Sequence, residues 1–202
     1  MKPVFISVDV EVTDTDPVFG RLMQVGLASE SGNELQLVFP VKNTAKTSDW
    51  VKENLKELLE GCWWMQSETH HLPPLRSGER YINGAFYRQV AVMERWVVAE
   101  RMMAAGFELK DGLFHFPDAE GVEIPEAVMV CYCGGLDFGF IAKALAHCGL
   151  RNPFHYEFVE ISSLAMGKLG LPWGFSESQL EEKIGLAPLD PSKKHNALED
   201  DR

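Results

Sequence analysis

The sequence predicts an α/β protein in which helices cover both faces of a mixed β-sheet. Three strand-like runs open the chain in close succession, and helix-like and strand-like runs alternate after them. The early strands favour an antiparallel meander, and the later alternation favours parallel strands. At 202 residues the chain suits a single domain over residues 1–202, which can bury a core without disulfides.

The first half of the chain is rich in β-branched and aromatic residues where strands are expected. A turn signal at residues 31–33 separates the second strand from the third. The expected strands are residues 4–10, 22–28 and 34–41, and the expected helices are residues 50–59, ended by Gly61, and residues 86–105, ended by Gly106. Between these helices, residues 62–83 are expected to be a loop that includes a short helix at most.

The second half of the chain contains clear signals for helix starts and helix ends. Ser176 and Gln179 form a capping-box pattern that opens a helix, and Gly149 ends an earlier one. The expected elements are an irregular or hairpin segment at 110–125, strands at 127–132 and 158–161, and helices at 136–148, 162–168, 176–184 and 196–202.

Composition indicates an ordinary globular protein of a reducing compartment. The four cysteines form no CxxC pair, so we expect buried thiols rather than a zinc site or disulfides. No apolar run is long enough to span a membrane. The N-terminus enters a strand pattern without a secretory signal, and we therefore expect a cytoplasmic protein.

Two carboxylates stand two residues apart at the end of the first strand. Side chains at i and i+2 of a strand point to the same face, so Asp9 and Glu11 are expected to lie side by side. Like charges at ~4 Å repel by roughly 1 kcal/mol in water and ~4 kcal/mol at an intermediate dielectric. Solvent at the strand end, a raised pKa or a bound cation can each relieve that repulsion.

A third acidic residue, Asp137, follows the strand at 127–132 and opens a helix. A capping role is one interpretation, since the helix dipole favours a carboxylate there. The other is a functional role, because loops at the carboxyl ends of strands line the functional crevice of an open α/β sheet.

The end of the chain carries the pattern H-x-A-x-x-D, from His195 to Asp200. In one continuous helix these two side chains would lie about 140° apart around the axis. We therefore expect His195 in the loop before the last helix and Asp200 one turn into it, so that both reach one cleft.

Taken together, Asp9-x-Glu11, Asp137 and the His195-to-Asp200 pattern resemble the three exonuclease motifs of the DEDDh (DnaQ-like) superfamily. The likeness covers nearly the whole chain in motif order and element type, and residues 21–28 resemble that family's second strand. It implies a ribonuclease-H-like fold. It also implies hydrolysis of phosphodiester bonds at the 3′ end of DNA or RNA, with release of nucleoside 5′-monophosphates.

The resemblance further implies a centre with two divalent cations, Mg²⁺ or Mn²⁺. Asp9 would bridge both ions, Glu11 and Asp200 would complete the inner sites, and Asp137 would act through water. Hard oxygen ligands favour these ions over zinc, and two ions about 3.5–4 Å apart can serve both the attacking and the leaving oxygen. His195 is implied as the general base, a role that an imidazole pKa near about 6.5 suits.

The sequence departs from the family pattern in several places. Val12 follows Glu11 where threonine is common, although Thr13 comes next as usual; backbone N–H groups of both are implied to hold the 3′ nucleotide. Cys133 stands where asparagine often precedes the second motif. Family-atypical extra length falls at residues 62–83 and 110–125. The chain ends two residues after Asp200, so we expect the last helix to be truncated.

Substrate contacts follow less directly from the sequence. Lys194, with Lys193 beside His195, can meet a phosphate backbone, and solvated lysines are the alternative. Further basic residues gather at Lys42, Lys46, Lys52 and Lys56. Aromatic residues that can stack on a base, or pack in the core instead, are Trp63, Trp64 and Phe138. The adjacent histidines His70 and His71 are expected to be an exposed pair rather than metal ligands.

The net charge of −11 argues against tight binding over a long nucleic-acid footprint and is compatible with an enzyme that takes a short single-stranded 3′ end. The alternatives are a non-catalytic nucleic-acid or protein-interaction module on the same fold, and an endonuclease of related fold. DNA and RNA both stay open as substrates, and so do a homo-oligomer and a protein partner.

Overall fold

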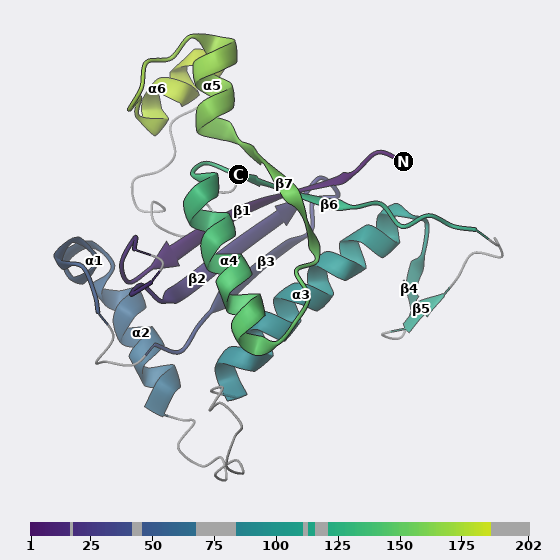
Figure 1. Ribbon diagram of the computed structural model, residues 1–202, viewed down its shortest axis with the longest axis horizontal. Helices are drawn as coiled ribbons and strands as arrows, with labels where there is room; N and C mark the ends of the chain where they lie inside the picture. Colours follow the sequence, from purple (N-terminus) through teal and green to yellow (C-terminus); the bar gives the residue numbers. More distant parts are fainter. Residues whose placement is uncertain (17, 42–45, 68–83, 111–112, 116–120, 187–202) are drawn as a thin grey trace.

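The protein is built around a five-stranded mixed sheet with the strand order β3-β2-β1-β6-β7 (Figure 1). The structure, a computed structural model, describes residues 1–16, 18–41, 46–67, 84–110, 113–115 and 121–186. The antiparallel part of the sheet consists of β1 (Val4–Val12), β2 (Leu22–Ser29) and β3 (Glu34–Val38). The parallel part adds β6 (Ala127–Cys131) and β7 (Phe154–Glu160) on the other side of β1.

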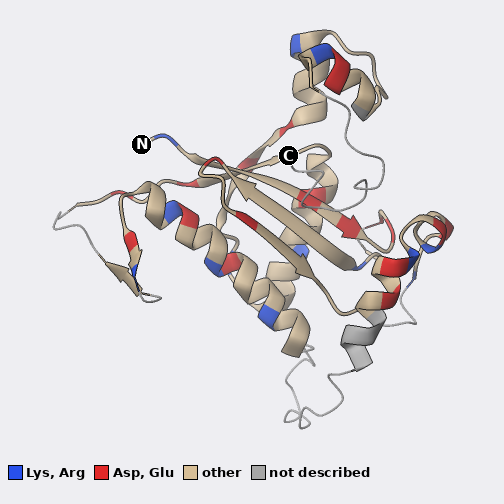
Figure 2. Ribbon diagram, turned by 180° about the vertical axis from the view of Figure 1, so that it is seen from behind, with Lys and Arg blue, Asp and Glu red and all other residues tan. Residues whose placement is uncertain are grey.

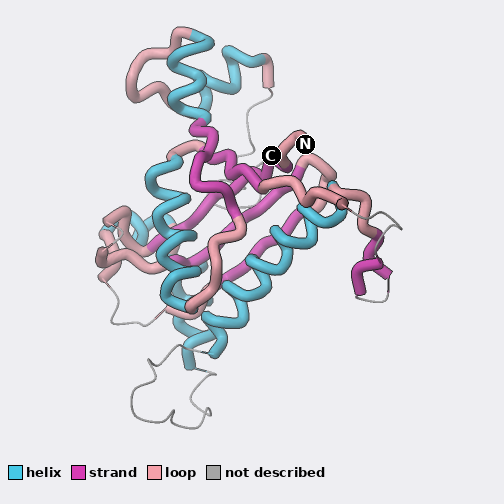
Figure 3. Tube along the Cα trace, turned by 45° about the vertical axis from the view of Figure 1, so that its right-hand side comes forward, coloured by secondary structure: helices cyan, strands magenta, loops and turns pink. Residues whose placement is uncertain are grey.

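Six helices and a small hairpin are described around this sheet. The helices are α1 (Asp49–Asn54), α2 (Lys56–Ser67), α3 (Gly84–Ala104), α4 (Gly134–Cys148), α5 (Ile161–Leu169) and α6 (Glu177–Ile184). Strands β4 (Glu108–Lys110) and β5 (Leu113–His115) form a separate two-stranded sheet. Figure 3 shows α5 and α6 projecting beyond the carboxyl end of β7, away from the main sheet.

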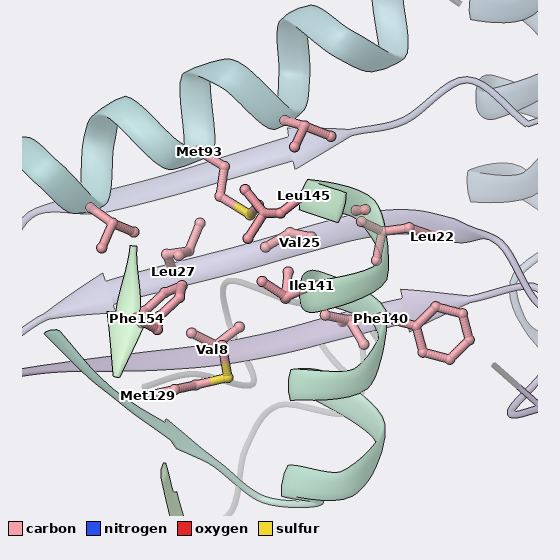
Figure 4. Packing of buried hydrophobic residues seen from close by; sticks show 14 of the residues in the cluster. Val8, Leu22, Val25, Leu27, Met93, Met129, Phe140, Ile141, Leu145 and Phe154 are labelled. Atoms are coloured by element: carbon pink, nitrogen blue, oxygen red, sulfur yellow. The ribbon is translucent and has the colours of Figure 1, made fainter. Parts of the chain in front are cut away.

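The main core lies between one face of the sheet and the two long helices α3 and α4. Every even-numbered residue of β1 is buried, while the odd-numbered residues are only partly buried. Figure 4 shows Val8 and Val25 of the sheet meeting Met93 of α3 and Ile141 of α4. The alternation along β1 therefore fixes which face receives the helices, and it leaves Asp9 and Glu11 on the opposite face.

A second, smaller cluster joins α1 and α2 to the sheet. Met23 packs there with Val51, Leu59 and other residues of these two helices, and Val38 packs against the cluster from β3. Its strand neighbour Leu37 belongs to the main core. Because adjacent strand residues point to opposite faces, helices contact the sheet from both sides, as the sequence predicts. None of the helices that the structure describes is long and apolar enough to cross a membrane.

The predicted meander, the long helix ended before Gly106 and the capping box at Ser176 are confirmed. Gly61 does not end its helix: a break at Leu55 separates α1 from α2, and α2 continues through Gly61 so that the next residue, Cys62, packs against Met23. The expected helix at 136–148 begins earlier, at Gly134, and the expected strand at 158–161 is longer, Phe154–Glu160. The expected helix at 196–202 lies outside the described residues.

Candidate active site

Two carboxylates leave the end of β1 on the face that the core does not use. Asp9 and Glu11 are half-buried, and the three residues interleaved with them, Val8, Val10 and Val12, are buried in the core. In the antiparallel ladder Asp9 lies opposite Gly26, and Glu11 lies opposite Gln24 of β2. The same-face geometry predicted for Asp9 and Glu11 therefore follows from the register of the sheet.

The third carboxylate, Asp137, lies in the first turn of α4, which follows the carboxyl end of β6. Its side chain is 3% exposed. The backbone N–H of Cys133 donates to Oδ2 of Asp137 at 3.3 Å. The backbone N–H of Val10 is a further donor to this carboxylate, and Val10 is the residue between Asp9 and Glu11.

The unequal lengths of β1 and β6 explain how Asp137 reaches β1. The two parallel strands pair only over Val4–Ser7 of β1, whereas β1 itself continues to Val12. Among the described residues, no strand pairs with β1 beyond Ser7 on that side. The start of α4 lies there instead, and Asp137 supplies the acceptor that the peptide of Val10 requires.

The surroundings of Asp137 oppose its ionisation. Burial is the largest influence and raises the pKa of Asp137 to about 7, against the hydrogen bonds from Cys133, Val10 and its own backbone N–H. The nearby charge of Glu160 raises the pKa further. A carboxylate in this position is stabilised in its charged form by a nearby cation, so the electrostatics fit a site that receives one.

Glu160 is an acidic residue beside Asp137 that the sequence analysis did not single out. It ends β7 and pairs in register with Cys131, the last residue of β6. Its Oε1 accepts from the backbone N–H of Gly134 at 3.2 Å, and its Oε2 accepts from the hydroxyl of Ser163. The signal in the sequence was a carboxylate at the end of a predicted strand, the same signal that marks Asp9 and Glu11.

Thr13 closes the turn that follows β1. Its side chain is fully buried, its N–H donates to the carbonyl of Arg21 at 2.9 Å, and its Oγ1 accepts from the N–H of Arg21 at 2.9 Å. Its carbonyl accepts from the N–H of Ser48 at 2.8 Å. The Thr13 amide is thus engaged within the protein. Nucleotide contact by Val12 and Thr13 stays a prediction.

The remaining predicted site residues either lie outside the described residues or make other contacts. His195, Asp200, Lys193 and Lys194 lie outside the described residues, as do Lys42, His70 and His71. Lys46 pairs with Asp14, Lys52 with Asp49 and Lys56 with Glu60. Figure 2 shows basic residues on α1, at one end of the molecule. Of the aromatic candidates, Phe138 stacks on Phe158 with ring centroids 5.3 Å apart, while the side chains of Trp63 and Trp64 are outside the description.

The donors available to a metal at this site are carboxylate oxygens. Over the described ranges, no group of three or more histidine, cysteine, aspartate or glutamate side chains could hold a metal ion. Asp9, Glu11 and Asp137 carry hard oxygen donors on two neighbouring elements, but these three side chains do not by themselves form such a group. That donor type fits Mg²⁺ or Mn²⁺ better than zinc.

Comparison with solved structures places the fold of this chain among exonuclease folds. The nuclease domain of 3'hExo, described as a DEDDh family member bound to rAMP, superposes with a TM-score of 0.56 at 13% identity, over 98% of this chain and 86% of that one. Exonuclease I from Methylocaldum szegediense gives a TM-score of 0.52 at 14% identity, over 100% of this chain and 38% of that one. Exonuclease I from E. coli, in complex with a dA16 oligonucleotide, gives 0.51 at 14% identity, over 98% and 38%.

The chain therefore has a DEDDh exonuclease-like fold, and the predicted ribonuclease-H-like mixed sheet is confirmed. It spans 38% of the length of these two exonuclease I chains. No family model matches the sequence, and no curated protein matches it. The likeness is thus one of fold, carried at low sequence identity.

Proposed function

We propose that this chain is a metal-dependent 3′–5′ exonuclease that hydrolyses the terminal phosphodiester bond of a single-stranded DNA or RNA 3′ end and releases nucleoside 5′-monophosphates. The observation that carries the proposal is the position of Asp137. Its buried carboxylate accepts a hydrogen bond from the backbone N–H of Val10, the residue that separates Asp9 from Glu11 in the sequence. The exonuclease-like fold supports this interpretation of the acidic residues.

In the proposed site, Asp9, Glu11 and Asp200 would hold two divalent cations, Mg²⁺ or Mn²⁺, and Asp137 would act through water. When bound, the cations supply Lewis-acid stabilisation of the attacking and leaving oxygens. Asp9 and Glu11 provide a rigid pair of donors, because β1 lies in the centre of the sheet and its other face is packed against the core.

His195 is the proposed general base, taking the proton of the attacking water at its imidazole nitrogen. Positioned base catalysis is typically worth about 10²–10⁴-fold. His195→Ala should therefore lower turnover by about that factor and leave metal affinity nearly unchanged. An equal loss of metal affinity would show that His195 is a ligand rather than a base.

The decisive experiment follows 5′-labelled single strands of DNA and RNA, each incubated with the full chain and Mg²⁺ or Mn²⁺. We expect a ladder that shortens stepwise from the 3′ end, stops in EDTA and returns when cation is added in excess. Asp9→Asn should abolish it. Asp49→Asn is the matched control, since the Asp49 side chain is 91% exposed on α1, and should leave the ladder intact.

The outcomes separate the alternatives. A folded wild-type chain that binds either strand without shortening it would indicate a non-catalytic binding module. Cleavage of a circular strand would indicate an endonuclease. Equal activity of Asp9→Asn and wild type would contradict the proposed site itself.

A further inference from the structure

A hydrogen bond between Gly134 and Glu160 joins the start of α4 to the end of β7. Oε1 of Glu160 accepts from the backbone N–H of Gly134 at 3.2 Å, and this N–H belongs to the first residue of the helix. The N-cap residue of α4, Cys133, makes no side-chain capping hydrogen bond. Glu160 therefore supplies, from another strand, an acceptor for one of the free N–H groups at the start of α4.

Aromatic packing fixes the same junction. A Cβ built on Gly134 would lie 2.1 Å from the ring of Phe158, so the backbone of α4 approaches β7 more closely than any side chain at position 134 allows. Phe158 also stacks on Phe138, the residue after Asp137. Residues 158 and 160 of one strand thus hold both the first turn of α4 and the neighbour of its buried carboxylate.

The identity of residue 160 is the unexpected part of this junction. A neutral acceptor could also bond the Gly134 N–H, whereas a glutamate places a second negative charge near the buried Asp137. Like charges at short range cost free energy unless a cation offsets them. The cost is therefore tolerated at the start of a helix that carries a proposed site residue.

We propose that Glu160 is a positioning residue for Asp137, holding the first turn of α4 through Gly134. It acts through the hydrogen bond that its Oε1 accepts, and Ser163 at the start of α5 orients the carboxylate by donating to Oε2. The inference rests on the proposed function only where activity is the readout, because the anchoring of α4 is measurable without catalysis.

The first arm measures hydrogen–deuterium exchange of peptides covering residues 134–137 in the full chain. Glu160→Ala should speed exchange there by about fivefold, the effect of losing one net hydrogen bond. Glu160→Gln keeps an acceptor oxygen and should restore most of the protection. The matched control is Glu157→Ala on the same strand, whose side chain is 72% exposed and should leave the exchange unchanged.

The second arm measures kcat against Mn²⁺ concentration. Loss of an outer partner typically costs about 10–100-fold in metal affinity or activity, and Glu160→Ala should fall in that range while Glu160→Gln recovers most of it. The double variant Glu160→Ala with Asp137→Asn should be no slower than Asp137→Asn alone, because Glu160 acts through Asp137.

Three results overturn the inference. Glu160→Gln could be as impaired as Glu160→Ala, or the two losses in the double variant could multiply, or exchange at residues 134–137 could be unchanged in Glu160→Ala. An inactive wild-type chain would contradict the proposed function alone, and the exchange arm would still decide the role of Glu160.

Discussion

The buried carboxylate of Asp137 accepts a hydrogen bond from the backbone N–H of Val10, the residue that separates Asp9 from Glu11. This contact joins a helix start and a strand end that are more than a hundred residues apart in the sequence. It exists because β6 pairs with β1 only as far as Ser7, which leaves the remaining edge of β1 for α4. The position of one acidic residue thus depends on the relative lengths of two parallel strands.

The raised pKa of Asp137 predicts a pH-dependent stability in the metal-free protein. The folded pKa is about 7, against 3.8 for the unperturbed group, so between these values the folded chain holds a proton that the unfolded chain has lost. The free energy of unfolding should therefore fall as pH rises through this window, by about 4 kcal/mol at most. Above about pH 7 both states are ionised and the contribution levels off.

Urea unfolding in EDTA at several pH values tests whether the free energy of unfolding falls as pH rises. The difference in unfolding free energy between Asp137→Asn and wild type should grow from pH 4 to 7, because only wild type carries the titrating carboxyl. Excess Mn²⁺ at pH 8 should then stabilise wild type more than the variant. Parallel pH profiles for the two proteins would contradict the burial of an ionisable group at this position.

Gly134 and Gly135 offer a matched pair at the start of α4. In Gly134→Ala the new Cβ would meet the Phe158 ring at 2.1 Å, whereas nothing lies within 4 Å of a Cβ at Gly135. Overpacking typically costs about 1–3 kcal/mol, so Gly134→Ala should lower the melting temperature by roughly 2–10 °C. Gly135→Ala should be neutral or stabilising by up to about 1 kcal/mol, since alanine favours helix.

Exonuclease activity should be lower in Gly134→Ala than in Gly135→Ala, because the first turn of α4 carries Asp137. Thermal melts and ladder assays on both variants, at a temperature where each is fully folded, separate misplacement of the carboxylate from loss of fold. If Gly134→Ala melts and degrades substrate like wild type, the close approach of β7 to α4 is wrong.

Much of the fold could be predicted because its signals are local. The β-branched and aromatic residues at 4–10 indicate a strand, and the capping box of Ser176 with Gln179 indicates a helix start, so neither requires knowledge of distant residues. The pairing of Asp9 with Glu11 on one face follows from strand periodicity alone.

The failures come from contacts between distant parts of the chain. Gly61 looks like a helix end, yet the burial of Cys62 against Met23 keeps α2 intact through it. Gly134 looks like a loop residue, yet the Phe158 ring requires a glycine there inside a helix. Glu160 becomes recognisable only once β6 and β7 are known to be neighbours. Local patterns cannot specify such pairings.

Thr13 should stabilise the turn that leads from β1 to β2. Thr13→Val keeps the shape but removes the Oγ1 acceptor, leaving the N–H of Arg21 without this partner. This hydrogen bond is only partly buried, and the net loss of one hydrogen bond costs about 0.5–1.5 kcal/mol, so the urea midpoint should fall accordingly. Thr15→Val is the control, because Thr15 is exposed in the same turn and should change stability little. Equal effects of the two substitutions would show that the buried hydroxyl contributes nothing specific.

Cys133 is exposed, not buried as the sequence predicts, and its thiol should make the site sensitive to alkylation. Cys62, Cys131 and Cys148 are buried, and burial raises the pKa of the Cys62 thiol to about 12 and that of Cys148 above its usual value. Because the thiolate is the reactive form, N-ethylmaleimide should label Cys133 first in the folded protein.

An adduct on Cys133 adds bulk at the peptide whose N–H holds Asp137, so exonuclease activity should disappear in step with the first equivalent of label. Mass spectrometry of the native and the urea-unfolded protein should find one and four labelled cysteines respectively. Cys133→Ser should stay active after the same treatment, since the serine leaves the backbone donor in place and removes the nucleophile. Full activity of wild type carrying one label on Cys133 would show that this end of α4 tolerates displacement, and would place the reacting phosphodiester away from Asp137.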